Sequence, residues 1–208
     1  MLILSVDTAL TGCSACLLQD GKIIAYEADQ RPSKQAEMLI PMIDEMLKSK
    51  KISYSDIDLF SSSIGPGSFT GLRIGITAVK GFSLVTGKPA CGVTTLQALA
   101  LKGGGNGNVT AAINAGRNQF YAQNFDAELN PISEAKLVNY EDLGEFTPDN
   151  TTIITNAYEL LKEHYNGAVL EGDHCPTARE VAILAAKDQS LPAEPLYIRA
   201  PDAKKSTK

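Results

Sequence analysis

A glycine-rich turn at residues 65–75 is the segment best suited to hold an anion. Gly65, Pro66 and Gly67 separate a strand-like run, residues 57–64, from a run with helical spacing. Glycine permits backbone conformations closed to other residues, and proline fixes φ. At a helix start, such a turn leaves N–H groups free and points the positive end of the helix dipole outward, which suits a phosphate or a partner's carboxylate. The alternative is a tight turn whose small residues let helix and strand pack closely.

The glycine spacing matches neither of two common phosphate-binding motifs. Gly65, Gly67 and Gly71 are one residue too widely spaced for the G-x-G-x-x-G turn of dinucleotide-binding folds. A Walker A loop requires Ser or Thr after Gly-Lys, whereas Gly87 and Lys88 are followed by proline. The turn therefore predicts a site and no particular reaction.

Asp7 and Thr8 follow the first apolar run of the chain and are the sharpest candidate pair. A carboxylate at the end of a strand can hold Mg²⁺ together with retained water molecules. The alternative is that Asp7 caps the turn that runs to Gly12. The candidate nucleotide-binding residues are Asp7, Thr8, Gly65, Gly67 and Ser68.

Cysteine and histidine spacing argues against a metal or a redox centre. Cys13 and Cys16 form a C-x-x-C at the start of a predicted strand, where residues three apart point to opposite faces. His164 and His174 are the only histidines, and they lack the spacing of a paired zinc site. No G-x-S-x-G elbow occurs either, so we expect no catalytic residues and no metal.

Hydrophobic periodicity predicts an α/β protein with two lobes. The first half alternates strands and helices, and Asp20-Gly21 is a hairpin signal between the second and third strands. The predicted strands of this half are residues 2–7, 14–19, 22–29, a run ending at 64, and 90–93; its helices are 33–50, a run ending at 86, and 95–101. Residues 102–108 form a glycine-rich linker. Beyond it we expect strands at 109–114, 118–125, 135–138 and 151–155, and helices near 156–164 and 177–187.

Several segments resemble the TsaB (YeaZ) family of tRNA threonylcarbamoyladenosine biosynthesis proteins. The similarity rests on residues 2–8, 35–41, 65–82, 111–117 and 195–199. It is dense in the first half and patchy in the second. The chain departs from the family pattern at Gln35 and Ala36, where His and Ser are usual, at Asn114, where Asp is usual, and at the inserted Gly116.

The resemblance implies an actin-like ATPase (ribonuclease H-like) fold with mixed sheets and a degenerate second lobe. The glycine-rich linker, the order of the predicted elements and the basic end of the chain place the first lobe at residues 1–102, the second at 109–199 and a flexible basic tail at 200–208. The resemblance also implies a non-catalytic subunit that binds and activates a TsaD-like enzyme, together with a TsaE-like ATPase. No cofactor is expected to bind tightly; ATP or ADP, if used, would lie at an interface of the complex. Homodimerisation and contact with tRNA through the complex are further expectations.

The resemblance places the docking surface on the helices predicted at residues 33–50 and 69–86. The expected interface residues are Leu39, Ile43, Met46, Leu47, Gly71, Leu72, Arg73, Gly75, Ala78 and Val79. Gly71 and Gly75 would allow a partner helix to approach closely, with contact to the chain's own sheet as the alternative. Two rival functions are a nucleotide-dependent kinase or ATPase that uses Asp7 and the Gly65 turn, and a metallopeptidase-like protein.

Composition is that of an ordinary globular protein, and it disfavours independent, high-affinity binding to RNA. The chain has 208 residues, 44% hydrophobic and 21% charged, with a net charge of -5. A negative net charge disfavours independent binding to a polyanion. We expect neither a signal peptide nor a membrane span, and therefore a cytoplasmic protein whose cysteines are thiols.

Overall fold

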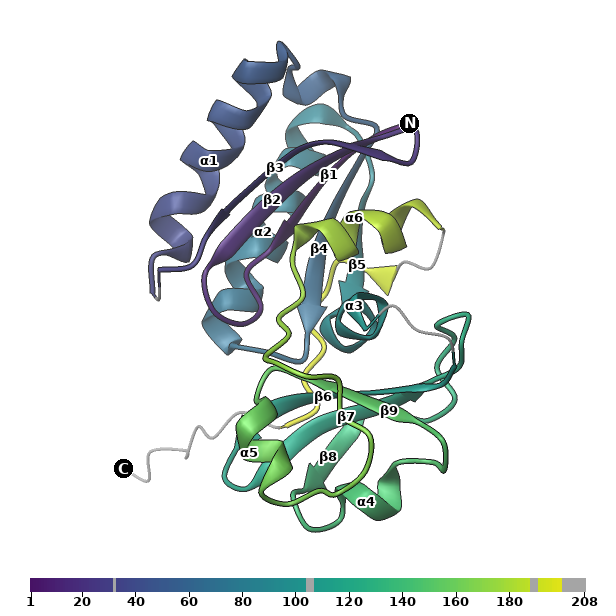
Figure 1. Cartoon of the computed structure of the whole chain (residues 1–208). Helices are drawn as coiled ribbons and strands as arrows, with labels where there is room; N and C mark the ends of the chain where they lie inside the picture. Colours follow the sequence, from purple (N-terminus) through teal and green to yellow (C-terminus); the bar gives the residue numbers. More distant parts are fainter. Residues whose placement is uncertain (32, 104–106, 188–190, 200–208) are drawn as a thin grey trace, which may run out of the picture.

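The computed structural model describes residues 1–31, 33–103, 107–187 and 191–199, and it has two lobes, each with its own sheet (Figure 1). The strands are β1 Leu2–Asp7, β2 Cys13–Gln19, β3 Lys22–Asp29, β4 Leu59–Gly65, β5 Ala90–Thr94, β6 Val109–Gly116, β7 Gln119–Phe125, β8 Lys136–Asn139, β9 Thr152–Thr155 and β10 Leu191–Pro192. The helices are α1 Gln35–Lys50, α2 Phe69–Thr86, α3 Thr95–Lys102, α4 Leu143–Phe146, α5 Tyr158–Lys162 and α6 Ala178–Ala186, with a short 3₁₀ turn, η1, at Tyr54–Asp56. The predicted elements are confirmed to within a few residues.

The first sheet has strand order β10-β5-β4-β1-β2-β3. β2 lies antiparallel to both β1 and β3, whereas β4 lies parallel to both β1 and β5. The β2–β3 hairpin turns at Asp20 and Gly21, whose φ values of 49° and 78° are those of the turn that the sequence predicts. The carboxyl ends of β1, β4 and β5 therefore meet at one edge, where ligands bind in open α/β sheets.

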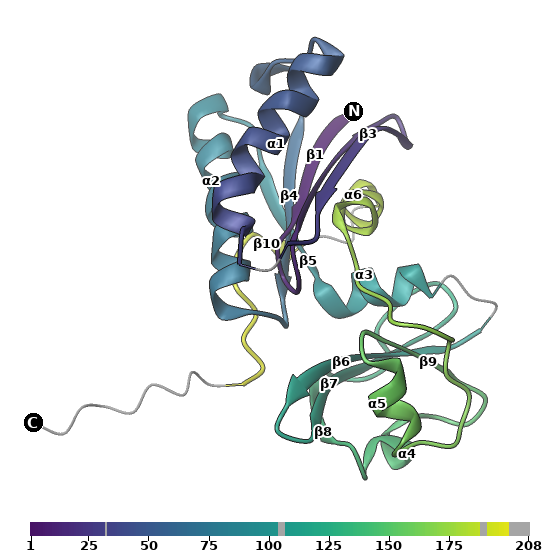
Figure 2. The same cartoon turned by 60° about the vertical axis from the view of Figure 1, so that its left-hand side comes forward.

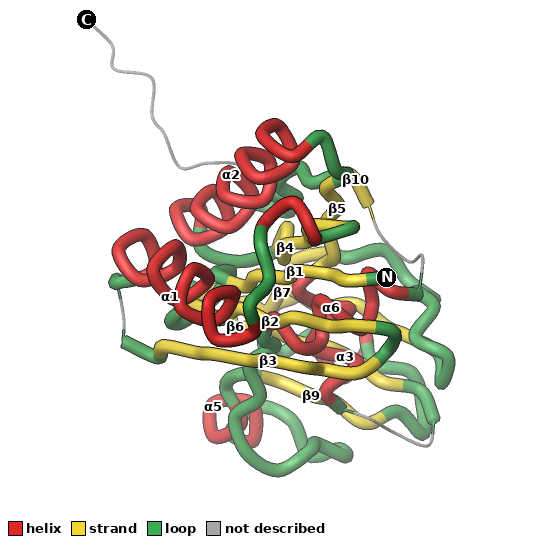
Figure 3. Tube along the Cα trace, turned by 90° about the horizontal axis from the view of Figure 1, so that it is seen from above, coloured by secondary structure: helices red, strands yellow, loops and turns green. Residues whose placement is uncertain are grey.

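Helices cover both faces of this sheet (Figures 2 and 3). α1 and α2 lie on one face, over a cluster that includes Leu4, Leu17 and Phe60. α6 lies on the other face, where Ala178 and Ala182 pack against Ile3 and Cys16. The alternation of side chains along β1 and β2 supplies both clusters, because neighbouring residues of a strand point to opposite faces.

The second sheet repeats the neighbour order of the first. Its order is β8-β7-β6-β9, with β6, β7 and β8 antiparallel and β9 parallel to β6. This corresponds to β3-β2-β1-β4 of the first sheet, so the predicted degenerate second copy is visible in the topology. α5 lies beside this sheet, and α3 packs on it from the first lobe through Leu96 and Leu99.

α6 and β10 belong to the first lobe, so the predicted second lobe of residues 109–199 includes too much of the chain. α6 packs on the first sheet, and β10 pairs with β5 at its edge. Val181 and Leu184 of α6 also pack in one cluster with Ala98 of α3. The order of elements along the chain placed α6 in the second lobe, because the sequence of a helix does not show which sheet the helix covers. Residues 104–106 of the predicted linker and the tail 200–208 lie outside the described residues.

Within the described residues, no helix is both long enough and apolar enough to cross a membrane.

Candidate docking site

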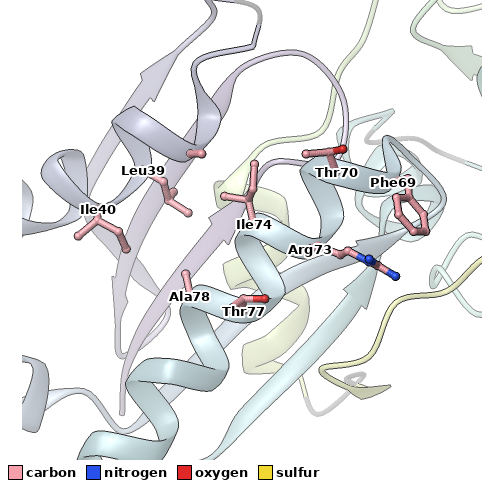
Figure 4. A pocket seen from close by; sticks show the side chains of 9 residues that line it. Leu39, Ile40, Phe69, Thr70, Arg73, Ile74, Thr77 and Ala78 are labelled. Atoms are coloured by element: carbon pink, nitrogen blue, oxygen red, sulfur yellow. The ribbon is translucent and has the colours of Figure 1, made fainter.

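An apolar groove lies between α1 and α2, the two predicted docking helices (Figure 4). It has a volume of about 620 Å³. The residues that line this α1/α2 groove are Ala36, Leu39, Ile40, Phe69, Thr70, Arg73, Ile74, Thr77 and Ala78. In Figure 4 Leu39, Ile74 and Ala78 lie between the two helices, and Arg73 points away from α1. Exposed apolar patches of this kind mark sites for a protein partner or a ligand.

The glycine face of α2 points inward, which corrects the predicted interface. A Cβ on Gly71 would overlap the carbonyl oxygen of Thr8, and a Cβ on Gly75 would come within 2.7 Å of the hydroxyls of Thr8 and Ser62. Leu72 and Val79 are also buried against the sheet. The small residues let α2 approach β1 and β4 of its own chain, so Gly71, Leu72, Gly75 and Val79 are not surface residues.

The apolar stripe of α1 likewise faces the core. Ile43, Met46 and Leu47 are buried with Leu4 and Phe60 under the helix, so these predicted interface residues belong to the core. Leu39 is buried but lines the edge of the groove, and Arg73 and Ala78 line it as well. The apolar stripe of a helix that covers a sheet does not show by itself which of its residues face the sheet and which remain exposed to solvent.

Most residues that line the groove are absent from the predicted interface. Ile40 and Phe69 expose 40% and 44% of their surface, and Ile74 and Thr77 complete the wall. The signal was present in the sequence, because Ala36 and Ile40 extend the apolar stripe of α1 beyond the width that one sheet face requires.

Asp7 is buried at the edge where the parallel strands of the first sheet end. Its side chain is 6% exposed, and its Oδ1 atom has no hydrogen-bond partner among the described residues. Burial raises the pKa of this carboxyl to about 6. Ser63 and Thr95, from the neighbouring β4 and α3, also have hydroxyl oxygens without a partner among the described residues. An unpaired buried polar group lowers the stability of the folded protein, so Asp7, Ser63 and Thr95 destabilise this edge of the sheet.

The other candidate nucleotide residues are used to join the loop after β1 to the start of α2. Thr8 Oγ1 donates to Gly71 O at 2.7 Å and accepts from Gly75 N at 3.2 Å. Ser68 N donates to Ala9 O at 2.7 Å, and Ser68 Oγ accepts from Gly71 N at 3.2 Å as the helix cap. The structure therefore brings these residues together, but their polar groups form hydrogen bonds within the chain.

The glycine turn makes the same close approach with its backbone. A Cβ on Gly67 would overlap Ala9 O, and one on Gly65 would lie 2.5 Å from Leu196 O. Gly65 has φ 122°, which other residues rarely adopt, and the Gly65–Pro66 peptide bond is cis. These glycines accommodate the chain's own backbone, which is the alternative that the sequence left open.

Cys13 and Cys16 lie in different cores, as predicted. Cys13 packs on the α1 side of the first sheet and Cys16 on the α6 side. Burial raises the pKa of Cys13 to about 11 and that of Cys16 to about 12.

We expect mild oxidation of the folded protein to leave Cys13 and Cys16 unlinked. The two thiols face opposite sides of β2, and their raised pKa values keep them as poorly reactive thiols. Mass spectrometry of tryptic fragments, without reduction, checks this. A Cys13–Cys16 disulfide in folded protein would contradict the strand placement.

Asn114 and the histidines have local contacts in the second lobe. Asn114 Oδ1 accepts from Gly116 N at 2.8 Å and from Tyr140 Oη at 3.1 Å, so it closes the β6–β7 turn. His164 packs against Tyr140, and His174 hydrogen-bonds to Glu171 O. Among the described residues no group of His, Cys, Asp and Glu side chains is arranged to hold a metal ion.

Two lobes of related topology, joined at the carboxyl ends of parallel strands, define a protein of the actin-like ATPase fold. Solved structures share this fold. YeaZ from Pseudomonas aeruginosa superposes with a TM-score of 0.82 over 94% of this chain and 99% of that chain, at 23% identity. The ADPNP-bound activator of 2-hydroxyisocaproyl-CoA dehydratase from Clostridium difficile superposes with a TM-score of 0.53 over 90% of this chain and 95% of that chain, at 9% identity.

Sequence comparisons identify the family. Residues 32–203 match the family described as "TsaD: tRNA N6-adenosine threonylcarbamoyltransferase". The tRNA threonylcarbamoyladenosine biosynthesis protein TsaB of Escherichia coli is 35% identical over 64% of this chain and 58% of its own length. TsaB of Bacillus subtilis is 26% identical over 78% of this chain and 67% of its own length. The matched region thus spans little more than half of the E. coli relative. The chain belongs to the family that the TsaD model describes and, within it, to the TsaB (YeaZ) family.

Proposed function

We propose that the chain is a non-catalytic subunit of the machinery that makes threonylcarbamoyladenosine in tRNA, and that it activates a TsaD-like enzyme by docking through the α1/α2 groove. The names of its relatives support the pathway. The observation that carries the docking role is the groove itself, since apolar side chains such as Ile40 and Phe69 remain exposed there.

Fold similarity supports the choice of partner. The chain matches the TsaD family over residues 32–203, a range that includes all of α1 and α2, so a TsaD-like enzyme has counterparts of both helices. Two related chains can then pair through equivalent helices about a pseudo-twofold axis, as identical chains pair in a symmetric dimer. A homodimer through the same groove is the resting form that this arrangement allows, and the enzyme would displace one copy.

The interior use of the candidate polar groups supports a role without catalysis. Thr8 and Ser68 hydroxyls hold the start of α2, and Asp7 is buried. A nucleophile or base must reach its substrate within hydrogen-bond distance, which a sealed group cannot do. In this proposal the TsaE-like ATPase, the tRNA and any ATP or ADP are bound by the assembled complex.

We expect Ile40→Glu to weaken binding to a TsaD-like enzyme by at least tenfold, or about 1.4 kcal/mol. The new carboxylate would be desolvated in the complex without a partner. Ile40 is 40% exposed, so the isolated variant should fold normally. Isothermal titration calorimetry with the purified enzyme measures the affinity, and a reconstituted assay of tRNA modification measures the activation.

The matched control is Leu84→Glu. Leu84 is an exposed apolar residue in the last turn of α2 and does not line the groove. It should leave binding and modification unchanged. Equal effects of the two substitutions would refute the groove as the docking site. Modified adenosine produced by the isolated chain, free of host enzyme, would refute the non-catalytic role.

A further inference from the structure

A short segment near the end of the described chain connects the α1/α2 groove with the second lobe. We call residues 196–199 the strap. It follows Ala193, which is buried in the core of the first lobe, and continues to Arg199, which contacts the second lobe. Both views in Figures 1 and 2 show this segment running from the first lobe toward the second.

The strap is fixed to the first lobe at the glycine turn. Leu196 N donates to Ile64 O at 2.8 Å, which extends the end of β4 by one backbone hydrogen bond. The absence of a side chain at Gly65 is what makes room for the Leu196 carbonyl group. The position of the strap is therefore specified by the backbone at the end of the sheet.

The next residue of the strap contacts the start of α2. The Tyr197 ring stacks on Phe69 with centroids 5.2 Å apart, and Tyr197 Oη accepts from Arg73 Nε at 3.2 Å. The Arg73 guanidinium in turn lies 3.9 Å from the centre of the Phe69 ring. Phe69 and Arg73 line the groove, so Tyr197 supports one end of the groove wall without lining it.

The last residues of the strap hold the second lobe. Ile198 packs against the cluster formed by α3 and the second sheet. Arg199 donates through Nη1 to Ala115 O at 2.9 Å and through Nη2 to Gln119 Oε1 at 2.7 Å. Both acceptors belong to the β6–β7 hairpin. A planar guanidinium that bonds two acceptors fixes orientation better than a single contact would.

We propose that Arg199 is a positioning residue for the α1/α2 groove: it fixes the strap on the β6–β7 hairpin, and the strap fixes Phe69 and Arg73 in the arrangement that a partner meets. This inference rests on the proposed docking function. It predicts that a residue outside the groove controls affinity, and that the orientation of the second lobe is coupled to docking. Coupling of this kind requires a connected element that both sites bias, which the strap supplies.

The test uses Arg199→Ala and a matched control, Arg179→Ala. The Arg199 guanidinium lies 5.8 Å from the centre of the Tyr121 ring. Arg179 likewise lies over a tyrosine ring, 3.8 Å from the centre of Tyr26, but on α6, across the sheet from the groove. Hydrogen exchange of the isolated chain is measured at residues 69–75 and 196–198. Arg199→Ala should speed exchange at both segments by about tenfold through local opening, with no change in the control.

The second readout is affinity for the TsaD-like enzyme. Arg199→Ala should weaken this affinity by about tenfold, whereas Arg179→Ala should leave it unchanged. Arg199→Lys should weaken it by less than tenfold, because lysine keeps the charge but lacks the planar pair of donors. Tyr197→Phe keeps the ring stack and removes only the acceptor for Arg73, so it should fall between wild type and Arg199→Ala.

The outcomes separate the two proposals. Unchanged affinity in Arg199→Ala, while Ile40→Glu still weakens binding by at least tenfold, would overturn the positioning role and leave the docking site intact. Faster exchange confined to residues 196–198 would overturn it as well. If the wild-type chain does not bind the enzyme, the docking proposal fails, and exchange at residues 69–75 still decides whether Arg199 orders the start of α2.

Discussion

Gly75→Leu should destabilise the isolated protein by roughly 1–3 kcal/mol or more, because the new side chain would be forced into a packed seam. A Cβ at this position already comes within 2.7 Å of Ser62 Oγ and Thr8 Oγ1. For a chain of this size, each kcal/mol corresponds to about 2–4 °C in the melting temperature. Thermal unfolding followed by circular dichroism should therefore show a drop of several degrees, and Gly71→Ala should show one too.

The control lies in the same helix. A Cβ on Gly81 would meet nothing within 4 Å, so Gly81→Ala should stabilise the helix by up to about 1 kcal/mol through helix propensity alone. If Gly75→Leu instead unfolds at the wild-type temperature and only loses its partner, α2 does not pack on its own sheet as described. This result would restore the surface role that the sequence predicts for Gly75.

The second large effect is a gain in stability from Asp7→Asn. The pKa of the Asp7 carboxyl is raised from 3.8 to about 6 because the group is buried. The folded state therefore disfavours the ionised form, by up to about 3 kcal/mol at neutral pH. Asparagine has nearly the same shape and no charge. At pH 7.5 the variant should unfold in urea at a higher midpoint than the wild type.

The pH dependence gives a separate check of the sign. Between pH 4 and pH 6 the folded wild-type protein holds a proton on Asp7 that the unfolded chain has released, so stability falls as the pH rises through this window. Asp7→Asn should lack this decline. Asp126→Asn is the control with opposite sign, since hydrogen bonds from Asn130 lower the pKa of Asp126. An unchanged or lower urea midpoint for Asp7→Asn would show that the charge on Asp7 is stabilised in the folded protein.

Much of the fold could be predicted because local patterns determine it. The alternation in β1 to β3, the Asp20-Gly21 turn and the limits of α2 are properties of neighbouring residues. The same reasoning placed Cys13 and Cys16 on opposite faces of a strand, as the structure has them.

The site was harder to predict because it depends on what lies opposite each residue. Gly71 and Gly75 permit close approach by a partner helix or by the chain's own sheet, and periodicity is the same in both cases. The structure shows that the sheet occupies this face. Tyr197 and Arg199 are far in sequence from Phe69 and Gln119, so only the folded chain reveals the strap.

The return of α6 and β10 to the first lobe also affects how the protein is synthesised. The ribosome makes the chain from its amino end, and domains generally fold as their segments emerge. The apolar face that carries Ile3, Cys16 and Leu18 stays uncovered until α6, at Ala178–Ala186, has left the ribosome. By then every strand of the second sheet has been made. The lobe that begins first is therefore the last to be completed, and the second lobe folds as an insertion within it.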